Sequence, residues 1–385
     1  MSASRKPGLG PRAAAALVVI AVAAGCAPAA PSAQPAAPSA PAASAPAPTD
    51  WATIVEAAGK EGVVVCGCPP RPDFTQLIKD GFEAAYPGIR LEATAAPLPD
   101  YWVRVEKEQD AGQYLWDVYA FGASIEVFQV KNKGGLAPLR DYMIGPDVGT
   151  DADWEGGLDA HFIDREQQYV FGFWNNVTNQ LSVNRDLLPT AQVSSFQELT
   201  DPVYRGKIVW QDPRIGGAGV NFAGAIYRRY GRDGLRKILV DQEPLLVRGN
   251  SDLAEQHVRG GRAVSMGRLT GDTLIPFLQA GVPMNLDVST PEDLAVISTA
   301  GSAPAVLKNA PHPNATKVFM NWLLSPPAQT VLSEKLLNNS ARKGVPPGDP
   351  QAVPQPGRDY FQVHLEDSMT GVMMEAQRAS RELIP

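Results

Sequence analysis

From Trp51 onward, the spacing of apolar residues predicts alternating helices and strands. Val63 to Cys66 is a short unbroken apolar run, which is typical of a strand covered on both faces. Apolar residues at helical spacing precede this run over 51–58 and follow it over 74–82. The rhythm continues with strands over 89–93 and 116–121 and helices over 101–111 and from 122 onward. This order favours a parallel α/β sheet with right-handed crossovers.

A second series of elements follows two further predicted strands, 169–174 and 180–183, with a turn at Asn175–Asn176. Such a pair often carries a chain from one lobe to another. The second series has strands over 207–211, 263–266, 286–288 and 294–298, and helices over 217–230, 233–240 and 251–259. Helices are also predicted over 314–324, 327–337 and 361–383. Two α/β lobes joined by more than one crossing predict a ligand cleft at the carboxyl ends of the strands.

The first fifty residues differ in kind from the rest of the chain. Basic residues precede a short apolar run, 13–24, which ends at Gly25-Cys26. About twelve residues span only ~18 Å as a helix, so the run predicts a secretory signal and not a membrane span. The ending resembles the bacterial lipobox, which predicts a lipid on Cys26. The uncharged Ala/Pro/Ser tract that follows predicts an extended tether, 26–49 including the cysteine.

Charge and length narrow the function classes. Arg5, Lys6 and Arg12 belong to the signal, which leaves 31 basic against 41 acidic residues, a net charge of −10. This balance argues against nucleic acid and against a broad anionic-lipid-binding face. The chain after the tether is long enough for two domains. We expect lobe 1 over 50–178 plus about 290–325, lobe 2 over 179–289, and C-terminal helices over 326–385 that pack on the lobes.

Cys66 and Cys68 are the other two cysteines, and Gly67 separates them. The favoured interpretation is that two small residues pack at a strand end. A strained or redox-active bridge and a metal site are the two competing interpretations. The sequence does not decide between them.

Several segments resemble the extracellular solute-binding proteins of ABC importers, the family that includes ferric-iron, thiamine and polyamine receptors. They are distributed over most of 51–336, and their order and spacing are more specific than any single piece. The segments are 51–65, 82–89, Asn184-Arg185-Asp186-Leu187, 204–214, 308–315 and Asn321-Trp322-Leu323-Leu324-Ser325. The resemblance implies a type II two-lobed fold, each lobe a mixed, mostly parallel sheet flanked by helices. It also implies that the two lobes close on a solute and that the protein passes it to a permease.

One departure bears on iron. Ferric-iron members of the family typically use adjacent tyrosines, but this chain has no Tyr-Tyr pair. The corresponding region, 265–271, holds Arg268 and no tyrosine. We therefore expect no direct tyrosinate coordination and no metal ligands, and Arg268 favours a negatively charged solute.

Loops at the carboxyl ends of strands, running into helix N-termini, supply the candidate site. Three such loops are 66–72, 121–124 and 212–219. Arg214 and Arg268 are the preferred anchors, because guanidinium binds carboxylate or phosphate bidentately. Each could instead be a structural or solvated arginine. Asp212 and Gly217 belong to the third loop, where glycines let a ligand approach the backbone.

The remaining candidates have an equally plausible structural role. Phe173 and Trp174 lie near the first predicted crossing and either line the pocket or pack in the core. Ser124 is expected to cap a helix and is also a candidate ligand contact. Cys68 lies in the first of these loops, 66–72, and either contacts the ligand or packs at the strand end. The four histidines lack metal-ligand spacing, and His312, in a Pro-His-Pro turn, is expected to be structural.

No Gly-x-Ser-x-Gly, His-Glu-x-x-His or P-loop motif is present, so no catalytic residue or cofactor is predicted. The main hypothesis is a lipid-anchored, monomeric receptor for a small anion, working outside the cytoplasm with a permease and an ATPase. The runner-up is an iron receptor that binds ferric iron together with an anion. Two hypotheses from different classes are an anchored extracellular enzyme and a sensor subunit for a membrane kinase. The sequence names neither the solute nor the membrane that holds the anchor.

Overall fold

The computed structural model describes residues 50–384, apart from 69–70, 97, 121, 179, 192, 216–217, 268, 270 and 300. The predicted signal, the tether and Cys26 lie outside the described residues, as do Gly217 and Arg268. Within the described ranges, every helix is too short or too polar to cross a lipid bilayer.

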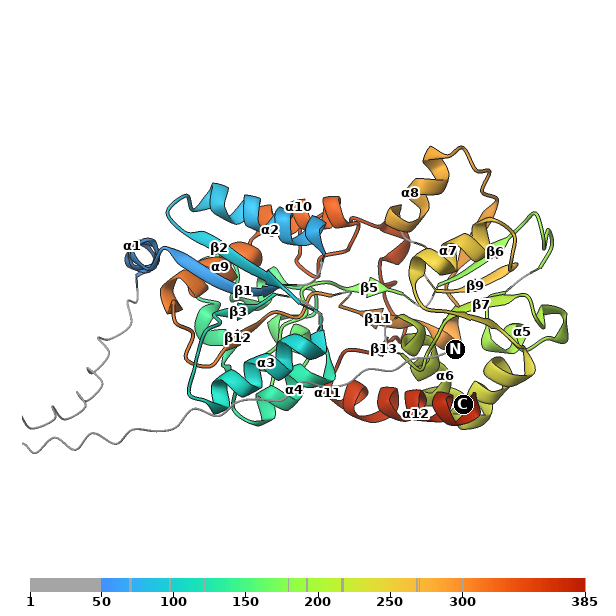
Figure 1. Ribbon diagram of the computed structural model, residues 1–385. Coiled ribbons are helices and arrows are strands. Elements are labelled where there is room, and N and C mark those ends of the chain that lie inside the picture. Colours follow the sequence, from blue (N-terminus) through green and yellow to red (C-terminus); the bar gives the residue numbers. More distant parts are fainter. Residues whose placement is uncertain are drawn as a thin grey trace, which may run out of the picture. The chain divides into compact units, whose positions relative to one another are not determined.

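The first sheet has five strands in the order β2-β1-β3-β12-β4. Four of them, β2, β1, β3 and β12, can be followed in Figure 1. β1 is parallel to β2 and β3, whereas β12 lies antiparallel between β3 and β4. Its strands are β1 (Val63–Cys68), β2 (Arg90–Ala95), β3 (Val118–Tyr119), β4 (Leu136–Ala137) and β12 (Ala305–Leu307). Its flanking helices are α1 (Trp51–Glu61), α2 (Pro72–Ala85), α3 (Leu98–Asp110), α4 (Ile125–Asn132), α9 (Pro313–Leu323) and α10 (Pro326–Leu336). The sheet is therefore mixed, with two parallel and two antiparallel pairings.

Local sequence signals explain where these helices begin and end. Asp50 is the N-cap of α1, where its carboxylate accepts a hydrogen bond from the Thr53 amide at 3.2 Å. Gly62 ends the helix with φ of 70°, a conformation that glycine adopts without a Cβ penalty. α2 packs its apolar stripe inward, and Phe82 meets Phe319 of α9 edge to face at 5.1 Å. The core of this lobe thus joins N-terminal elements to a helix that comes much later in the chain.

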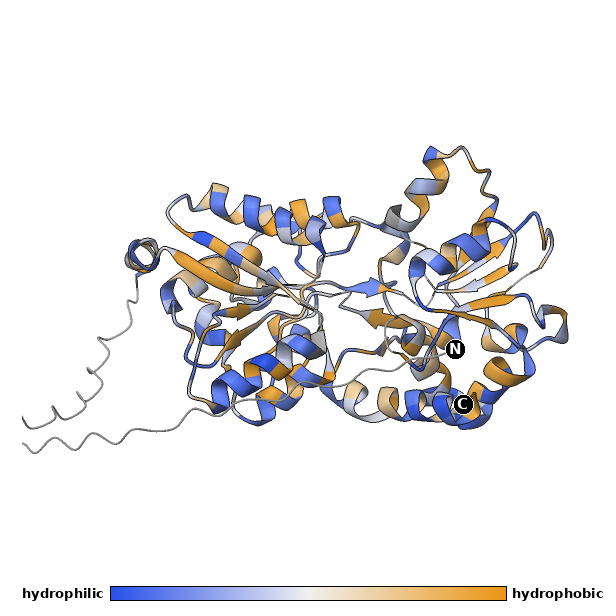
Figure 2. Cartoon of the chain, in the orientation of Figure 1, coloured by the Kyte–Doolittle hydropathy of each residue, from blue (hydrophilic) through white to orange (hydrophobic). Residues whose placement is uncertain are grey.

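The second sheet also has five strands, in the order β10-β6-β9-β7-β8. β7 is parallel to β8 and β9, and β6 runs antiparallel to β9 and β10. Its strands are β6 (Leu181–Asn184), β7 (Ile208–Gln211), β8 (Leu245–Val247), β9 (Val264–Met266) and β10 (Leu286–Ser289). Its helices are α5 (Phe196–Leu199), α6 (Ala218–Arg236), the π-helix η5 (Lys237–Asp241), α7 (Asn250–Val258) and α8 (Gly271–Gln279). Figure 2 shows apolar residues concentrated on the strands, and helices that carry both apolar and polar residues around them.

A third, three-stranded sheet in the order β13-β11-β5 joins the segments between the two larger sheets. Its strands are β5 (Asn176–Val177), β11 (Val296–Ser298) and β13 (Phe361–Gln362). The predicted turn at Asn175–Asn176 is therefore wrong, because Asn176 pairs with Ser298 across β5 and β11. The chain leaves the first sheet's residues along β5 and returns along β11.

The end of the chain departs from the predicted helix over 361–383. Phe361 pairs in β13 with Val296, and helix begins only at α11 (Glu366–Ser368). The π-helix η8 (Met369–Met373) and α12 (Met374–Leu383) follow, and α12 packs on α6. Short 3-10 turns are η1 (Leu139–Tyr142), η2 (Asp151–Asp153), η3 (Leu158–His161), η4 (Pro202–Tyr204), η6 (Glu292–Leu294) and η7 (Pro350–Ala352).

Candidate functional site

Cys66 and Cys68 form a disulfide at the carboxyl end of β1, with their Cα atoms 5.7 Å apart. The favoured interpretation of two packed thiols is therefore wrong, and the bridge is the interpretation that holds. Both residues are buried. Between them, Gly67 is needed for space, since a Cβ there would lie 2.3 Å from the ring of Tyr101. The bridge leaves no free thiolate here for a metal.

Phe173 and Trp174 belong to the same buried cluster as Cys68. The Trp174 ring lies 5.3 Å from Phe173 and 6.2 Å from Phe74, edge to face in both cases. Both predicted residues are almost fully buried, so core packing is what they do in this structure. The indole nitrogen of Trp174 is buried without a hydrogen-bond partner among the described residues. That unpaired donor is a reason to keep Trp174 as a candidate.

Ser124 occupies the N-cap position of α4, but its side chain makes no capping hydrogen bond. The capping prediction is wrong in this respect. Its hydroxyl is buried, 8% of the residue being exposed, and has no partner in the described part of the chain. A buried hydroxyl at the positive end of a helix is ready to bind an acceptor. Just before it, Gly122 comes so close to Gly301 that a Cβ would lie 3.0 Å from the latter's Cα.

Asp212 and Arg214 form an ion pair in the loop between β7 and α6, with a shortest distance of 2.8 Å. The Arg214 Nε also donates to Asp212, and a terminal nitrogen donates to the Ile384 carbonyl at 2.7 Å. Burial raises the pKa of Asp212, but the hydrogen bonds from Arg214 outweigh it and hold that pKa below its usual range. The structure therefore brings these two predicted residues together and also ties them to the end of the chain.

The first turn of α6 lies against the end of β7. A Cβ on Gly219 would lie 2.0 Å from the carbonyl oxygen of Gln211, so only glycine fits without a shift. The Gln211 side chain also accepts a hydrogen bond from the Gly219 amide at 3.2 Å. These two contacts hold the start of the helix at the strand end.

A polar network missed by sequence reasoning lies beside β5. The Asn176 side chain donates to Asn338 at 3.3 Å and accepts from the Asn339 amide at 2.9 Å. The Asn175 amide donates to the Asn339 carbonyl at 2.8 Å. Asn176, Asn338 and Asn339 are all buried. The adjacent asparagines after the predicted helix 327–337 were the available signal, but nothing in the sequence indicates their partner.

His312 has the structural role expected of it. Its backbone amide and ring Nδ1 both contact the carboxylate of Asp117, at 2.7 and 2.8 Å. Asp117 is fully buried and also accepts from the Val65 amide at 2.8 Å. The three groups connect the loop before α9 to β1 and β3.

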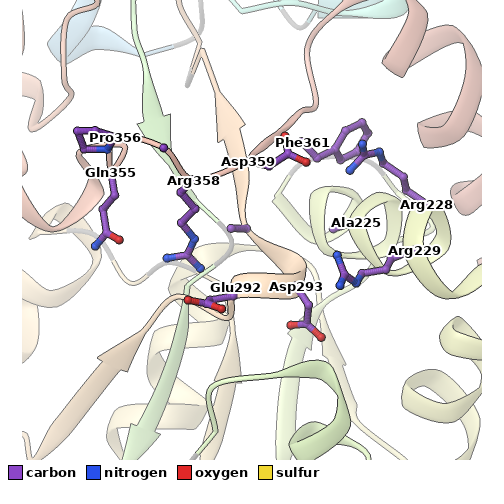
Figure 3. A pocket seen from close by; sticks show the side chains of 12 residues that line it. Ala225, Arg228, Arg229, Glu292, Asp293, Gln355, Pro356, Arg358, Asp359 and Phe361 are labelled. Carbon is purple, nitrogen blue, oxygen red and sulfur yellow. The ribbon is translucent and has the colours of Figure 1, made fainter.

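A pocket of about 810 Å³ is lined by none of the predicted site residues. It lies where α6, η6 and β13 meet (Figure 3). Apart from Ser124 at the start of α4, the described site residues fall into two groups. Cys68, Phe173 and Trp174 share a buried cluster with the first sheet, and Asp212 and Arg214 pair beside the second.

Solved structures with this fold cover nearly the whole folded region. Iron-bound HitA from Pseudomonas aeruginosa matches with a TM-score of 0.62 and 16% identity, over 84% of this chain and 99% of that one. The periplasmic binding protein AfuA from Actinobacillus pleuropneumoniae, with exogenous fructose-6-phosphate bound, gives 0.58 and 18%, over 84% and 97%. Trichodesmium IdiA (FutA) in complex with iron and citrate gives 0.64 and 15%, over 84% and 99%. At these identities the likeness shows a shared fold, that of two-lobed periplasmic binding proteins, and confirms the predicted fold class.

The sequence itself matches a family model. The model for bacterial extracellular solute-binding proteins covers residues 78–355, well over half of the chain. The match includes every strand of the second sheet, every strand of the first sheet except β1, and the connecting strands β5 and β11. The chain therefore belongs to the bacterial extracellular solute-binding proteins, the solute-binding components of ABC importers.

Proposed function

We propose that this protein captures a small anionic solute between its two lobes and delivers it unchanged to the permease. The observation that carries the anion class is Ser124. Its buried hydroxyl, without a described partner, lies at the N-terminus of α4, where the helix dipole and backbone amides favour negative charge. A carboxylate, phosphonate or phosphate ester would satisfy that hydroxyl.

The two arginines take different parts in this proposal. Arg214 is already paired with Asp212, and leaving that pair would uncover a partly buried carboxylate. We assign Asp212 and Arg214 the role of holding the loop that contains Gly217. Arg268, which follows β9, supplies the positive charge that binds the solute. Cys68, Phe173 and Trp174 support the wall on the side of the first sheet.

The ligands of the neighbouring folds agree with the anion class. AfuA is described with fructose-6-phosphate, and the Trichodesmium protein with iron and citrate. Both ligand sets include an anion. For iron itself, the chain has no Tyr-Tyr pair, and the corresponding region, 265–271, holds Arg268 and no tyrosine. An anion without iron is therefore the first choice, and ferric iron bound with an anion is the runner-up.

The test is native mass spectrometry of the purified protein, followed by thermal-shift titration with citrate, inorganic phosphate and a phosphate ester. A bound anion raises the melting temperature with concentration, as mass action requires. Arg268→Ala and Ser124→Ala are expected to reduce that shift. Arg205→Ala is the matched control, because it removes one positive charge from an exposed pair on the second lobe.

Each result decides between the candidates. A shift that needs ferric iron as well as the anion would select the iron receptor. Chemical conversion of the bound solute would indicate an enzyme. Full affinity in both Arg268→Ala and Ser124→Ala would refute the anion site.

We also propose that a lipid on Cys26 anchors the protein outside the cytoplasm and that the tract 27–49 is the tether. Intact mass and membrane fractionation test this. Cys26→Ser should lose the lipid mass and release the protein into the soluble fraction, whereas a protein that stays in the membrane fraction would contradict the anchor. Size-exclusion chromatography with light scattering tests the expected monomer.

A further inference from the structure

The pocket of Figure 3 is separate from the proposed solute site and has its own chemistry. It is lined by α6, by the η6 turn, by Ala295 just before β11, by the loop 355–359 and by Phe361 of β13. Its volume of about 810 Å³ is within the ~300–1,000 Å³ that small-molecule sites occupy. Two of the three strands in the connecting sheet begin at its wall.

Three arginines line the pocket: Arg228, Arg229 and Arg358. Among the described residues, none of the three has a carboxylate within ion-pair distance. Two other arginines of α6 do form ion pairs: Arg232 with Glu382, and Arg236 with Asp241 at 3.6 Å. Most other arginines of the described ranges are paired as well. Unpaired guanidinium groups gathered in one pocket indicate a site for an anionic group.

Contacts with the protein hold two of these arginines in place. The Arg228 guanidinium lies over the ring of Phe361, 5.0 Å from its centroid. Arg358 donates to the Thr290 carbonyl at 3.2 Å, and its Nε is buried without a partner in the described chain. Groups already held in position lose little freedom when a ligand binds.

The pocket also contains carboxylates, which repel a ligand that carries only negative charge. The Asp293 carboxylate already accepts hydrogen bonds from the Tyr230 hydroxyl at 2.6 Å and from the Phe196 amide at 3.1 Å. Glu292 and Asp359 are exposed and make no hydrogen bond or ion pair within the described residues. Figure 3 shows the acidic and basic side chains lining the same space. A purely anionic ligand would meet repulsion from the two available carboxylates.

We propose that this pocket binds a small zwitterion, such as an amino acid or a short peptide. Its carboxylates contact Arg228 and Arg358, and its ammonium group contacts Glu292 or Asp359. Such a ligand satisfies both signs of charge in the pocket. Binding of the zwitterion does not depend on the nature of the transported solute.

The test uses glycyl-glutamate and its N-acetyl derivative in isothermal titration calorimetry with the purified full chain. The two probes carry the same carboxylates and differ in the ammonium group. We expect glycyl-glutamate to bind at least about tenfold more tightly than the acetylated probe. Arg228→Ala with Arg358→Ala should weaken it by at least about tenfold. Arg90→Ala, an exposed change on the first lobe, should leave it unchanged.

The titrations distinguish the two places where the dipeptide could bind. Absence of saturable binding, or equal binding of the two probes, would overturn the zwitterion site. Weakening by Arg268→Ala and not by the pocket variants would show that the dipeptide occupies the solute site instead. Arg228→Ala alone removes only an exposed side chain, so it tests the pocket even where Arg358→Ala lowers stability. Failure here leaves the anion screen of the main site unaffected.

Discussion

Replacing Lys131 by Met should destabilise the fold by about 3 kcal/mol. Lys131 lies in α4 and is paired with Glu366, 2.6 Å away, and with Glu166. The side chains of Lys131 and Glu366 are only 2% and 1% exposed. Removing one partner of a buried pair typically costs ~3–5 kcal/mol, because the remaining charge stays buried.

Contacts that Glu366 keeps without Lys131 place the expected loss of unfolding free energy at the lower end of that range. Without Lys131, the Glu366 carboxylate still accepts from the Arg165 amide at 3.0 Å and lies 3.5 Å from its guanidinium. The Arg165 side chain is 50% exposed, so water weakens this compensation without removing it. Replacing both partners, as Lys131→Met with Glu366→Leu, should recover most of the loss, since no buried charge is then left alone.

The assay is urea denaturation followed by tryptophan fluorescence, with the free energy of unfolding obtained by linear extrapolation. Lys133→Met is the matched control. Lys133 lies two positions later, is 64% exposed and pairs with Glu106 at the surface, where a pair contributes ~0–1 kcal/mol. A loss below about 1 kcal/mol for Lys131→Met, or a double variant less stable than the single one, would refute the buried-charge explanation.

Three further predictions concern stability. His257 is fully buried, with Nδ1 3.1 Å from the Arg262 carbonyl, and burial lowers its pKa to about 4. The unfolded chain therefore binds a proton at this residue below pH ~6.5, whereas the folded protein binds it only near pH 4. The free energy of unfolding of the wild type should therefore fall by about 2 kcal/mol between pH 7 and 5 through this group. His257→Gln should lack that component, so parallel pH profiles of unfolding free energy would contradict it. Gly67→Ala should lower the melting temperature, because its Cβ clashes with the Tyr101 ring, and an unchanged melting curve would count against the clash. Gly59→Ala, in an exposed helical position with nothing within 4 Å, should instead raise stability by ~0.5–1 kcal/mol in the same assay.

The sequence predicted those elements whose own residues determine them. α1 and β1 agree closely with their predicted ranges, because helical spacing and an unbroken apolar run are local signals. β4 and β12 were missed, since strands of two or three residues form only when the fold brings a partner beside them. The segment 169–174 is apolar as a strand would be, yet it makes only isolated bridges, at Phe171 and Trp174.

The candidate site could be predicted less well for the same reason. The sequence identified Arg214 as a cation beside a strand end, but its pairing with the carbonyl of Ile384 depends on the folded position of the C-terminus. Ser124 was identified as a helix start, whereas its unpaired hydroxyl is a property of the packed structure. The disulfide was one of several interpretations until the strand geometry was known. The type and position of each residue are known from the sequence, whereas its contacts depend on the folded structure.

The position of β12 constrains the order in which the strands of the two large sheets can pair as the chain emerges from its N-terminus. β12 lies between β3 and β4 in the first sheet, yet it follows every strand of the second sheet in the chain. A chain that emerges from its N-terminus can therefore complete the strand pairing of the second sheet, 181–289, before that of the first. Until residue 307 has emerged, β3 has an open edge and β4 lacks the partner that joins it to the sheet. The strand pairing of the first sheet is therefore completed after that of the second, and β13 and α12 then add to β11 and α6.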